Sequence, residues 1–229
     1  MAYSRERAAT VQAEFIRRVY NWMALGLAAT ALVALYTAGS PWLQRVIFGN
    51  SLVFFGLIIG ELILVFWLSA AIERLAYSTA SMMFFVYSAL NGLTLSVIFM
   101  VYTETSIAST FFVTAGTFGA TSLYGYTTKR DLSSWGGFLF MGLIGIILAS
   151  VVNIFLNSPM VYWLVTYAGI IVFVGLTAYD TKKLKDMALA GFASEEAEGK
   201  SAVMGALALY LDFINLFLML LRIFGSRRD

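Results

Sequence analysis

Seven stretches of about 20 apolar residues constrain this chain more than any other feature of its sequence. A helix needs about 20 mainly apolar residues to cross the hydrocarbon core of a bilayer. The predicted spanning helices are residues 19–38, 51–71, 77–100, 106–127, 134–156, 160–181 and 203–224. We therefore expect an all-α integral membrane protein with seven transmembrane helices and with the lipid bilayer as its main partner.

The composition favours lipid as the solvent and excludes several kinds of chemistry. Hydrophobic residues make up 60% of the 229 residues, and charged residues make up 12%, which is about half the share in a soluble domain. Histidine and cysteine are both absent, which excludes Ser-His and Cys-His catalysis, histidine or thiolate zinc sites, and disulfides. A net charge of +2 is too small for a nucleic-acid binder. We expect no nucleic-acid partner and no resident cofactor.

The positions of lysine and arginine predict how the chain crosses the membrane. Cytoplasmic loops of membrane proteins carry an excess of these residues. Most of the 15 basic residues fall on the cytoplasmic side when the N-terminus is placed there and the spans alternate. This orientation predicts a polar cytoplasmic segment 1–18 and a transmembrane domain 19–229 whose cytoplasmic loop is 182–202. Basic residues near the C-terminus leave the side of that end open.

Three carboxylates fall within the apolar stretches. Glu61 lies in the second span, Asp180 lies near the inner end of the sixth, and Asp212 lies in the seventh. A charge at the centre of a bilayer costs at least about 2.5–3.5 kcal/mol, so such residues usually face a bundle interior or water. A protonated carboxyl that bonds between helices, or an ion pair, would also explain any one of them. Three in one bundle favour a polar cavity.

The seventh span carries small and polar residues at helical spacing. They recur every three or four residues, which places them on one face of a helix. The residues of this stripe are Gly205, Ala208, Asp212, Asn215, Met219 and Arg222. Leucine and phenylalanine occupy the other faces. The pattern predicts a central helix that turns its stripe towards a cavity.

Two other spans carry weaker patterns. In the third span, Tyr87, Asn91 and Thr94 form a short polar face, and in the second, Gly56 and Gly60 form a GxxxG motif that favours close helix packing. The fourth span has a hydroxyl stripe, for which bonding back to the helix's own carbonyls is favoured over a pore-lining role. Its residues are Thr110, Thr114, Thr117, Thr121, Tyr124 and Thr128.

Two aspartates on neighbouring helices have a characteristic chemistry. Like charges in a low dielectric favour a shared proton, so the pair titrates as a unit. Such a pair also attracts a hard cation such as Ca²⁺, which prefers oxygen ligands. Asp212 lies roughly 14 Å along its helix at about 1.5 Å per residue, whereas Asp180 lies near the end of its own. Spacing alone does not bring them together.

Two motifs resemble those of a known family. Residues 178–184 read Ala-Tyr-Asp-Thr-Lys-Lys-Leu, and residues 207–217 read Leu-Ala-Leu-Tyr-Leu-Asp-Phe-Ile-Asn-Leu-Phe. These motifs, together with residues 89–96 and 153–155, resemble the transmembrane Bax inhibitor motif family in its bacterial YccA/YetJ-like branch. The resemblance implies a seven-helix fold with the last helix central. It also implies a pH-sensitive, passive calcium leak that is governed by aspartates in helices six and seven.

The resemblance assigns roles to individual residues. By motif match the aspartates are Asp180 and Asp212, which would hold the transported Ca²⁺ and respond to H⁺. Glu61 resembles the family's acidic position in helix two, and Arg74 is the candidate for its basic partner. Supporting residues within the matched motifs are Asn91, Tyr210 and Asn215. We expect a monomer in the bacterial inner membrane.

Other functions were weighed against the leak. An intramembrane aspartyl protease would match Tyr179-Asp180, but its second motif requires Gly-x-Gly-Asp, where this chain has Leu209-Tyr210-Leu211-Asp212. A retinal protein needs a lysine in the last helix, and no lysine follows Lys200. We therefore expect no enzyme activity. Two alternatives stay open: a proton-coupled transporter, and a regulator that binds a membrane-bound AAA protease through residues 1–18.

Overall fold

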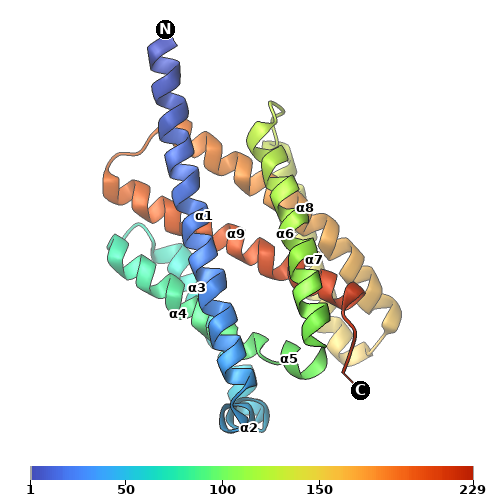
Figure 1. Cartoon of the computed structure of the whole chain (residues 1–229). Coiled ribbons are helices and arrows are strands. Elements are labelled where there is room, and N and C mark those ends of the chain that lie inside the picture. Colours follow the sequence, from blue (N-terminus) through green and yellow to red (C-terminus); the bar gives the residue numbers. More distant parts are fainter. Residues whose placement is uncertain (1, 229) are drawn as a thin grey trace. The chain divides into compact units, whose positions relative to one another are not determined.

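The computed structural model describes the backbone of residues 2–228 and the side chains of residues 10–228. Within these residues every regular element is a helix, as the sequence predicts (Figure 1). The helices are α1 (Ala2–Ala38), α2 (Pro41–Phe48), α3 (Ser51–Ala71), α4 (Tyr77–Leu95), α5 (Ile98–Val101), α6 (Glu104–Thr127), α7 (Ser133–Leu156), α8 (Pro159–Ala190) and α9 (Glu195–Phe224).

Six helices in the described part of the chain are long and apolar enough to cross a membrane. They cover residues 10–38, 51–71, 77–101, 133–156, 159–190 and 195–224. The fourth predicted span corresponds to α6, which has 24 residues. Its many threonines and serines make it less apolar than the other six helices. The count of seven crossings therefore stays a prediction.

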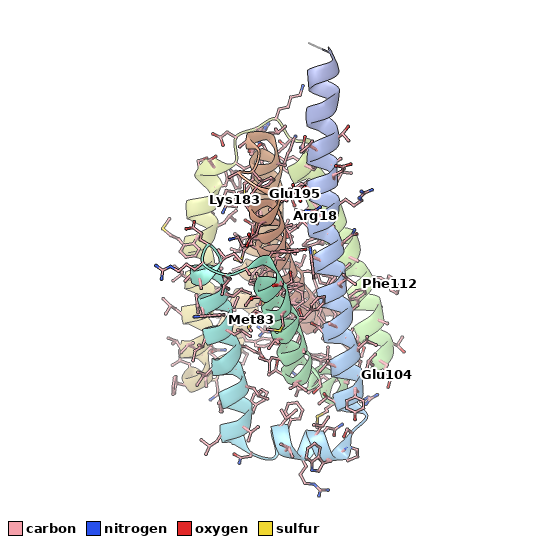
Figure 2. All side chains as sticks on the ribbon, turned by 90° about the vertical axis from the view of Figure 1, so that its left-hand side faces the viewer. Arg18, Met83, Glu104, Phe112, Lys183 and Glu195 are labelled. Carbon is pink, nitrogen blue, oxygen red and sulfur yellow. The ribbon has the colours of Figure 1, made fainter. Side chains whose placement is uncertain are left out.

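Large apolar side chains point away from the protein on several helices. Leu52 is 83% exposed, Phe112 is 73% exposed and Phe66 is 71% exposed. Figure 2 shows Phe112 on the outer side of α6. A soluble protein rarely leaves so much contiguous apolar surface in water. These helices are therefore built to face lipid.

The last long helix is the most buried of the six. In its most apolar segment 72% of the residues are buried, against 11–39% for the other five. The leucines Leu207, Leu209 and Leu216, which we expected on its outer faces, are at most 1% exposed. The apolar faces of this helix therefore pack against protein. Within the small and polar stripe, Gly205, Asp212 and Met219 are buried, and Ala208, Asn215 and Arg222 are half-buried.

The helices group into two compact units, and each is described by itself. The first contains residues 1–102, 187–210 and 228–229, and the second contains residues 103–186 and 211–227. One continuous helix, α9, contributes to both units, because the division falls between Tyr210 and Leu211. In the first unit α4 packs against α1 and α3. The short helix α2 lies across the ends of α1 and α3, which it joins (Figures 1 and 2).

The segment 182–202, which we expected as a loop, is mostly helical. Only residues 191–194 lie between α8 and α9. Gly191, with a φ of 83°, ends α8, and the Ser194 hydroxyl caps α9 by accepting the Ala197 N–H at 3.1 Å. Hydropathy marks where an apolar stretch ends, whereas a helix continues to the next residue that breaks it.

The polar segment 1–18 is likewise the start of a helix, because α1 begins at Ala2. Its side chains at residues 1–9 lie outside the described residues. The described part is anchored in the first unit. Arg18 forms an ion pair with Glu198 at 3.2 Å, beside the first turn of α9 (Figure 2), and the rings of Phe15 and Phe192 are 4.8 Å apart.

The prediction of close packing at Gly56 and Gly60 is wrong. A Cβ atom added to either glycine would meet nothing within 4 Å. The buried face of α3 carries Glu61 and Leu68 instead. A real close approach occurs at Gly125, where an added Cβ would lie 2.4 Å from the carbonyl oxygen of Ala178. The GxxxG spacing defines a smooth face but does not select the face that meets a neighbour.

Candidate functional site

The two predicted aspartates lie near each other in the second unit. Asp180 comes from α8 and Asp212 comes from α9, and their carboxylates are close enough to interact electrostatically. Asp212 is 4% exposed, and its Oδ2 has no hydrogen-bond partner among the described residues. Asp180 is half-buried and lies near the cation of Lys183. The structure thus brings together two carboxylates whose sequence spacing did not require it.

Close helix contacts position this pair. The contact of Gly125 with Ala178 lets α6 approach α8 two residues before Asp180. On α9, the residue after Asp212 is Phe213, whose ring lies 5.4 Å from those of Phe111 and Phe118 on α6. Edge-to-face aromatic packing of this kind stabilises a helix contact. The helices that carry the two aspartates therefore both pack against α6.

Glu61 occupies a different environment, in the first unit. Its Oε1 accepts a hydrogen bond from Thr94 at 3.0 Å, and its Oε2 accepts one from the Asn91 side chain at 3.4 Å. Asn91 in turn contacts Tyr87 by a side-chain hydrogen bond. The polar face of Tyr87, Asn91 and Thr94, which the sequence predicts on the third span, therefore binds the Glu61 carboxylate of the second span.

Tyr210 continues this polar cluster. It is fully buried, and its hydroxyl forms a 2.7 Å hydrogen bond with Thr30 Oγ1 of α1. Thr30 also donates to the carbonyl oxygen of Ser88 on α4 at 2.8 Å. The ring of Tyr210 packs edge-on against Tyr87, with centroids 6.0 Å apart. These contacts connect α9 to α1 and α4 within the first unit.

The remaining predicted site residues have simpler surroundings. Asn215 donates to the carbonyl oxygen of Leu211 at 2.8 Å, within its own helix. Arg74 is exposed just beyond the end of α3, and the described residues show no ion pair between it and Glu61. The expected ion pair does not form, because neutral donors from α4 already bond to the Glu61 carboxylate. Glu61 also lies many residues before Arg74 along the chain.

The hydroxyl stripe of α6 behaves as predicted at several positions. Thr114, Thr117 and Thr121 donate to the carbonyl oxygens four residues earlier, at 2.8 to 2.9 Å. Each hydroxyl is thereby satisfied within its own helix. Thr110 differs, because its buried hydroxyl has no partner among the described residues.

Two groups were missed by sequence reasoning. Thr30 is an isolated hydroxyl in an apolar span, so no pattern identifies it as the partner of Tyr210. Asp131, in the connection between α6 and α7, accepts the Ser133 N–H at 2.8 Å at the start of α7. The hydrogen bonds from Ser133 lower the pKa of this carboxyl. The signal was present, since an aspartate often accepts a hydrogen bond from the backbone N–H two residues later in a turn.

Metal ligands are few in the described residues. They contain no group of three or more acidic side chains that could hold a metal ion. Asp180 and Asp212 therefore form at most a two-carboxylate site.

The fold and the buried carboxylates define a multi-pass, all-helical membrane protein. Comparison with known families makes this specific: the family model for the inhibitor of apoptosis-promoting Bax1 matches residues 12–229. The chain belongs to the Bax inhibitor-1 family, as the motifs around Asp180 and Asp212 predict.

Curated relatives cover nearly the whole chain. The inner membrane protein YbhL of Escherichia coli strain K12 is 59% identical over 215 residues, which is 93% of this chain and 92% of the relative. An uncharacterized protein of Rickettsia prowazekii is 44% identical over 94% of this chain and 90% of its own length. One from Borreliella burgdorferi is 43% identical over 96% of this chain and 94% of its own length.

Proposed function

We propose that this protein is a passive calcium leak channel whose conduction depends on pH through Asp180 and Asp212. Membership of the Bax inhibitor-1 family supports the calcium leak. The observation that carries the role of the aspartates is the buried, unpartnered Oδ2 of Asp212 beside the like charge of Asp180. Such an arrangement has no structural benefit, because an unsatisfied buried polar group costs about 1–3 kcal/mol.

The pair acts on the cation through its charge. When both carboxylates are ionised, they attract Ca²⁺ and supply two of the six to eight oxygen ligands that this ion takes. Water and backbone carbonyls supply the others during passage. A proton shared by the pair cancels part of the charge and changes how the two carboxyl groups pack. The same two residues thereby serve as ion binder and pH sensor.

The proposal includes a topology. The helix α6 completes the seven crossings as the fourth span, since its 24 residues suffice and the hydroxyls of Thr114, Thr117 and Thr121 are bonded within the helix. The N-terminus lies in the cytoplasm, and the protein acts as a monomer. Its location is the bacterial inner membrane, as the name of the relative YbhL, an inner membrane protein, suggests. Glu61 adds negative potential along the path, and the protein has no enzyme activity.

Calcium flux into proteoliposomes, measured from about pH 5 to about pH 8, tests the proposal. The expected result is a pH-dependent flux in wild type that loses its pH dependence in Asp180→Asn and in Asp212→Asn. Asp131→Asn is the matched control, because Asp131 is an exposed aspartate in a helix connection. Identical pH profiles in wild type and both pair variants would remove the aspartates as sensors. No protein-dependent flux at any pH would remove the leak itself.

A further inference from the structure

The second unit contains a cavity of about 400 Å³ between α6, α7 and α8. This volume falls within the range of roughly 300–1,000 Å³ that is typical of ligand pockets. The cavity belongs neither to the aspartate pair nor to the Glu61 cluster. Its lining residues are Ala120, Thr121, Tyr124, Leu132, Trp135, Leu139, Val174, Gly175, Ala178 and Tyr179.

The wall of the cavity is chemically suited to hydrocarbon. Most of it is aliphatic or aromatic, and the Thr121 hydroxyl is already bonded to the carbonyl oxygen of Thr117 at 2.8 Å. Tyr124 and Trp135 are 49% and 58% exposed, so this side of the cavity opens outwards. Tyrosine and tryptophan are the residues that membrane proteins place at the boundary between lipid tails and headgroups. The cavity therefore offers room to an alkyl chain and no ligands to a cation.

Basic residues gather at one end of the same three helices. Lys129 and Arg130 are exposed in the connection that joins α6 to α7, next to the lining residues Tyr124 and Leu132. Lys182 follows Ala178 by one turn of α8, and therefore lies on the same helix face. The α6–α7 connection and this end of α8 lie together, since Lys185 donates to the carbonyl oxygen of Tyr126 at 2.6 Å.

Acidic groups reduce this charge but do not cancel it. Lys182 is bound to Asp186 at 2.5 Å and also interacts with Asp131. The five basic residues Lys129, Arg130, Lys182, Lys183 and Lys185 still outnumber the three acidic residues Asp131, Asp180 and Asp186, of which Asp180 lies near Lys183. The position of Lys183 on α8 can be seen in Figure 2. An apolar cavity thus lies beside an excess of positive charge.

We propose that this cavity binds one anionic phospholipid, with an acyl chain in the cavity and the phosphate at Lys129 and Arg130. Charge selects the occupant, because a basic residue near the membrane surface favours an anionic lipid by about 1 kcal/mol, which corresponds to about fivefold in affinity. The inference does not depend on the calcium leak. It assigns a lipid site to the outward-opening cavity of the second unit, whose lining includes neither Asp180 nor Asp212.

Native mass spectrometry of the full chain in detergent tests the lipid's identity. The probes are phosphatidylglycerol and phosphatidylcholine with the same acyl chains. One phosphatidylglycerol per chain is expected, bound about 25-fold more tightly than phosphatidylcholine, because two basic residues contribute about fivefold each. Equal binding of the two lipids would overturn the proposal. Displacement of phosphatidylglycerol by inorganic phosphate would also overturn it, because the site would then be a phosphate site without a role for the cavity.

Two variants separate the cavity from the charges. Ala120→Trp places a large ring over the cavity from an exposed position and is expected to weaken phosphatidylglycerol binding at least about tenfold. Ala108→Trp is the matched control, because Ala108 is exposed on the same helix and does not line the cavity. Replacing both Lys129 and Arg130 with glutamine is expected to remove the preference for phosphatidylglycerol. Unchanged affinity and preference in these variants would refute the assignment.

Tryptophan fluorescence locates the bound lipid without altering the cavity. Brominated phosphatidylglycerol, at about one lipid per chain, is expected to quench a component of wild-type emission that disappears in Trp135→Phe. Trp67→Phe is the control, since Trp67 is a similarly exposed tryptophan on α3 of the first unit. Quenching that survives in Trp135→Phe and is lost in Trp67→Phe would place the lipid elsewhere and contradict the proposal.

Discussion

Glu61 and Asp212 are both buried carboxylates in membrane-spanning helices, and their surroundings are opposite. Glu61 accepts hydrogen bonds from Thr94 and Asn91, so both of its oxygens have a partner. Asp212 leaves Oδ2 without a partner among the described residues and has Asp180 nearby. A satisfied polar cluster fixes helix contacts, whereas an unsatisfied buried group needs another explanation. We therefore propose that the aspartate pair carries conduction, whereas the Glu61 cluster of the first unit mainly fixes helix contacts.

The largest effect is expected on ion flux. Asp212→Asn removes the charge that attracts the cation, so we expect calcium flux in proteoliposomes to fall at least about tenfold. This corresponds to an increase of about 1.4 kcal/mol in the free-energy barrier to conduction. Glu61→Gln is the matched variant from the other cluster, and we expect it to change the flux by less. A larger loss in Glu61→Gln than in Asp212→Asn would reverse the comparison.

The same variant, Asp212→Asn, should raise the stability of the folded protein although it lowers the flux. Asp212→Asn removes the charge that faces Asp180 while leaving a polar side chain in place, so we expect the protein to be stabilised rather than destabilised. The measurement is thermal unfolding in detergent near neutral pH. Asp186→Asn serves as control, since it removes an exposed partner of Lys182. Marked destabilisation by Asp212→Asn would show that the carboxylate has a structural partner after all.

The polar cluster of the first unit, which contains Glu61 and Tyr210, should contribute less to the stability of the fold when one hydroxyl is removed. Tyr210→Phe removes the hydrogen bond to Thr30 and leaves the ring packing in place. We expect a loss of about 0.5–1.5 kcal/mol in unfolding free energy, with the pH profile of the flux unchanged. Tyr167→Phe, at an exposed tyrosine of α8, should have no effect. A shifted pH profile of the calcium flux in Tyr210→Phe would show that the polar cluster of the first unit takes part in pH sensing.

The smallest effect is expected at Asp131, outside the spanning helices. Hydrogen bonds from Ser133 lower its pKa from the ordinary value of 3.8. A carboxyl with a lowered pKa stabilises the folded chain above its unfolded pKa and loses that contribution as the pH falls through its folded value. Asp131→Asn should therefore lower the stability of the fold slightly from about pH 5 upwards, and the difference from wild type should disappear in more acidic solution. A difference that appears only in acidic solution and is absent near neutral pH would contradict this assignment.

Sequence patterns predicted the helices well and their contacts less well. The apolar stretches identified each long helix, because the cost of exposing backbone groups in lipid enforces helical structure. Hydropathy did not show that α8 continues to Ala190, because a charged helix segment in water has no apolar run. Spacing likewise placed Gly56 and Gly60 on one face but did not reveal that, among the described residues, an added Cβ at either glycine would meet nothing within 4 Å.

The candidate site was predicted one residue at a time. The energetic cost of charge in lipid singled out Glu61, Asp180 and Asp212. The partners of these residues depend on helix rotation and depth, which periodicity does not determine. For this reason Arg74 was expected beside Glu61, where the structure has Thr94 and Asn91. The proximity of Asp180 and Asp212 likewise emerged only from the packing of α6, α8 and α9.

Infrared difference spectroscopy of carboxyl protonation tests most directly whether Asp180 and Asp212 act as a coupled pair. Spectra of the purified protein would be recorded in lipid from about pH 5 to about pH 8. The account predicts a carboxyl band that titrates in wild type and in Glu61→Gln, and that is lost or shifted in both Asp180→Asn and Asp212→Asn. A band that titrates unchanged in both aspartate variants and disappears in Glu61→Gln would assign the pH response to the first unit and contradict the account.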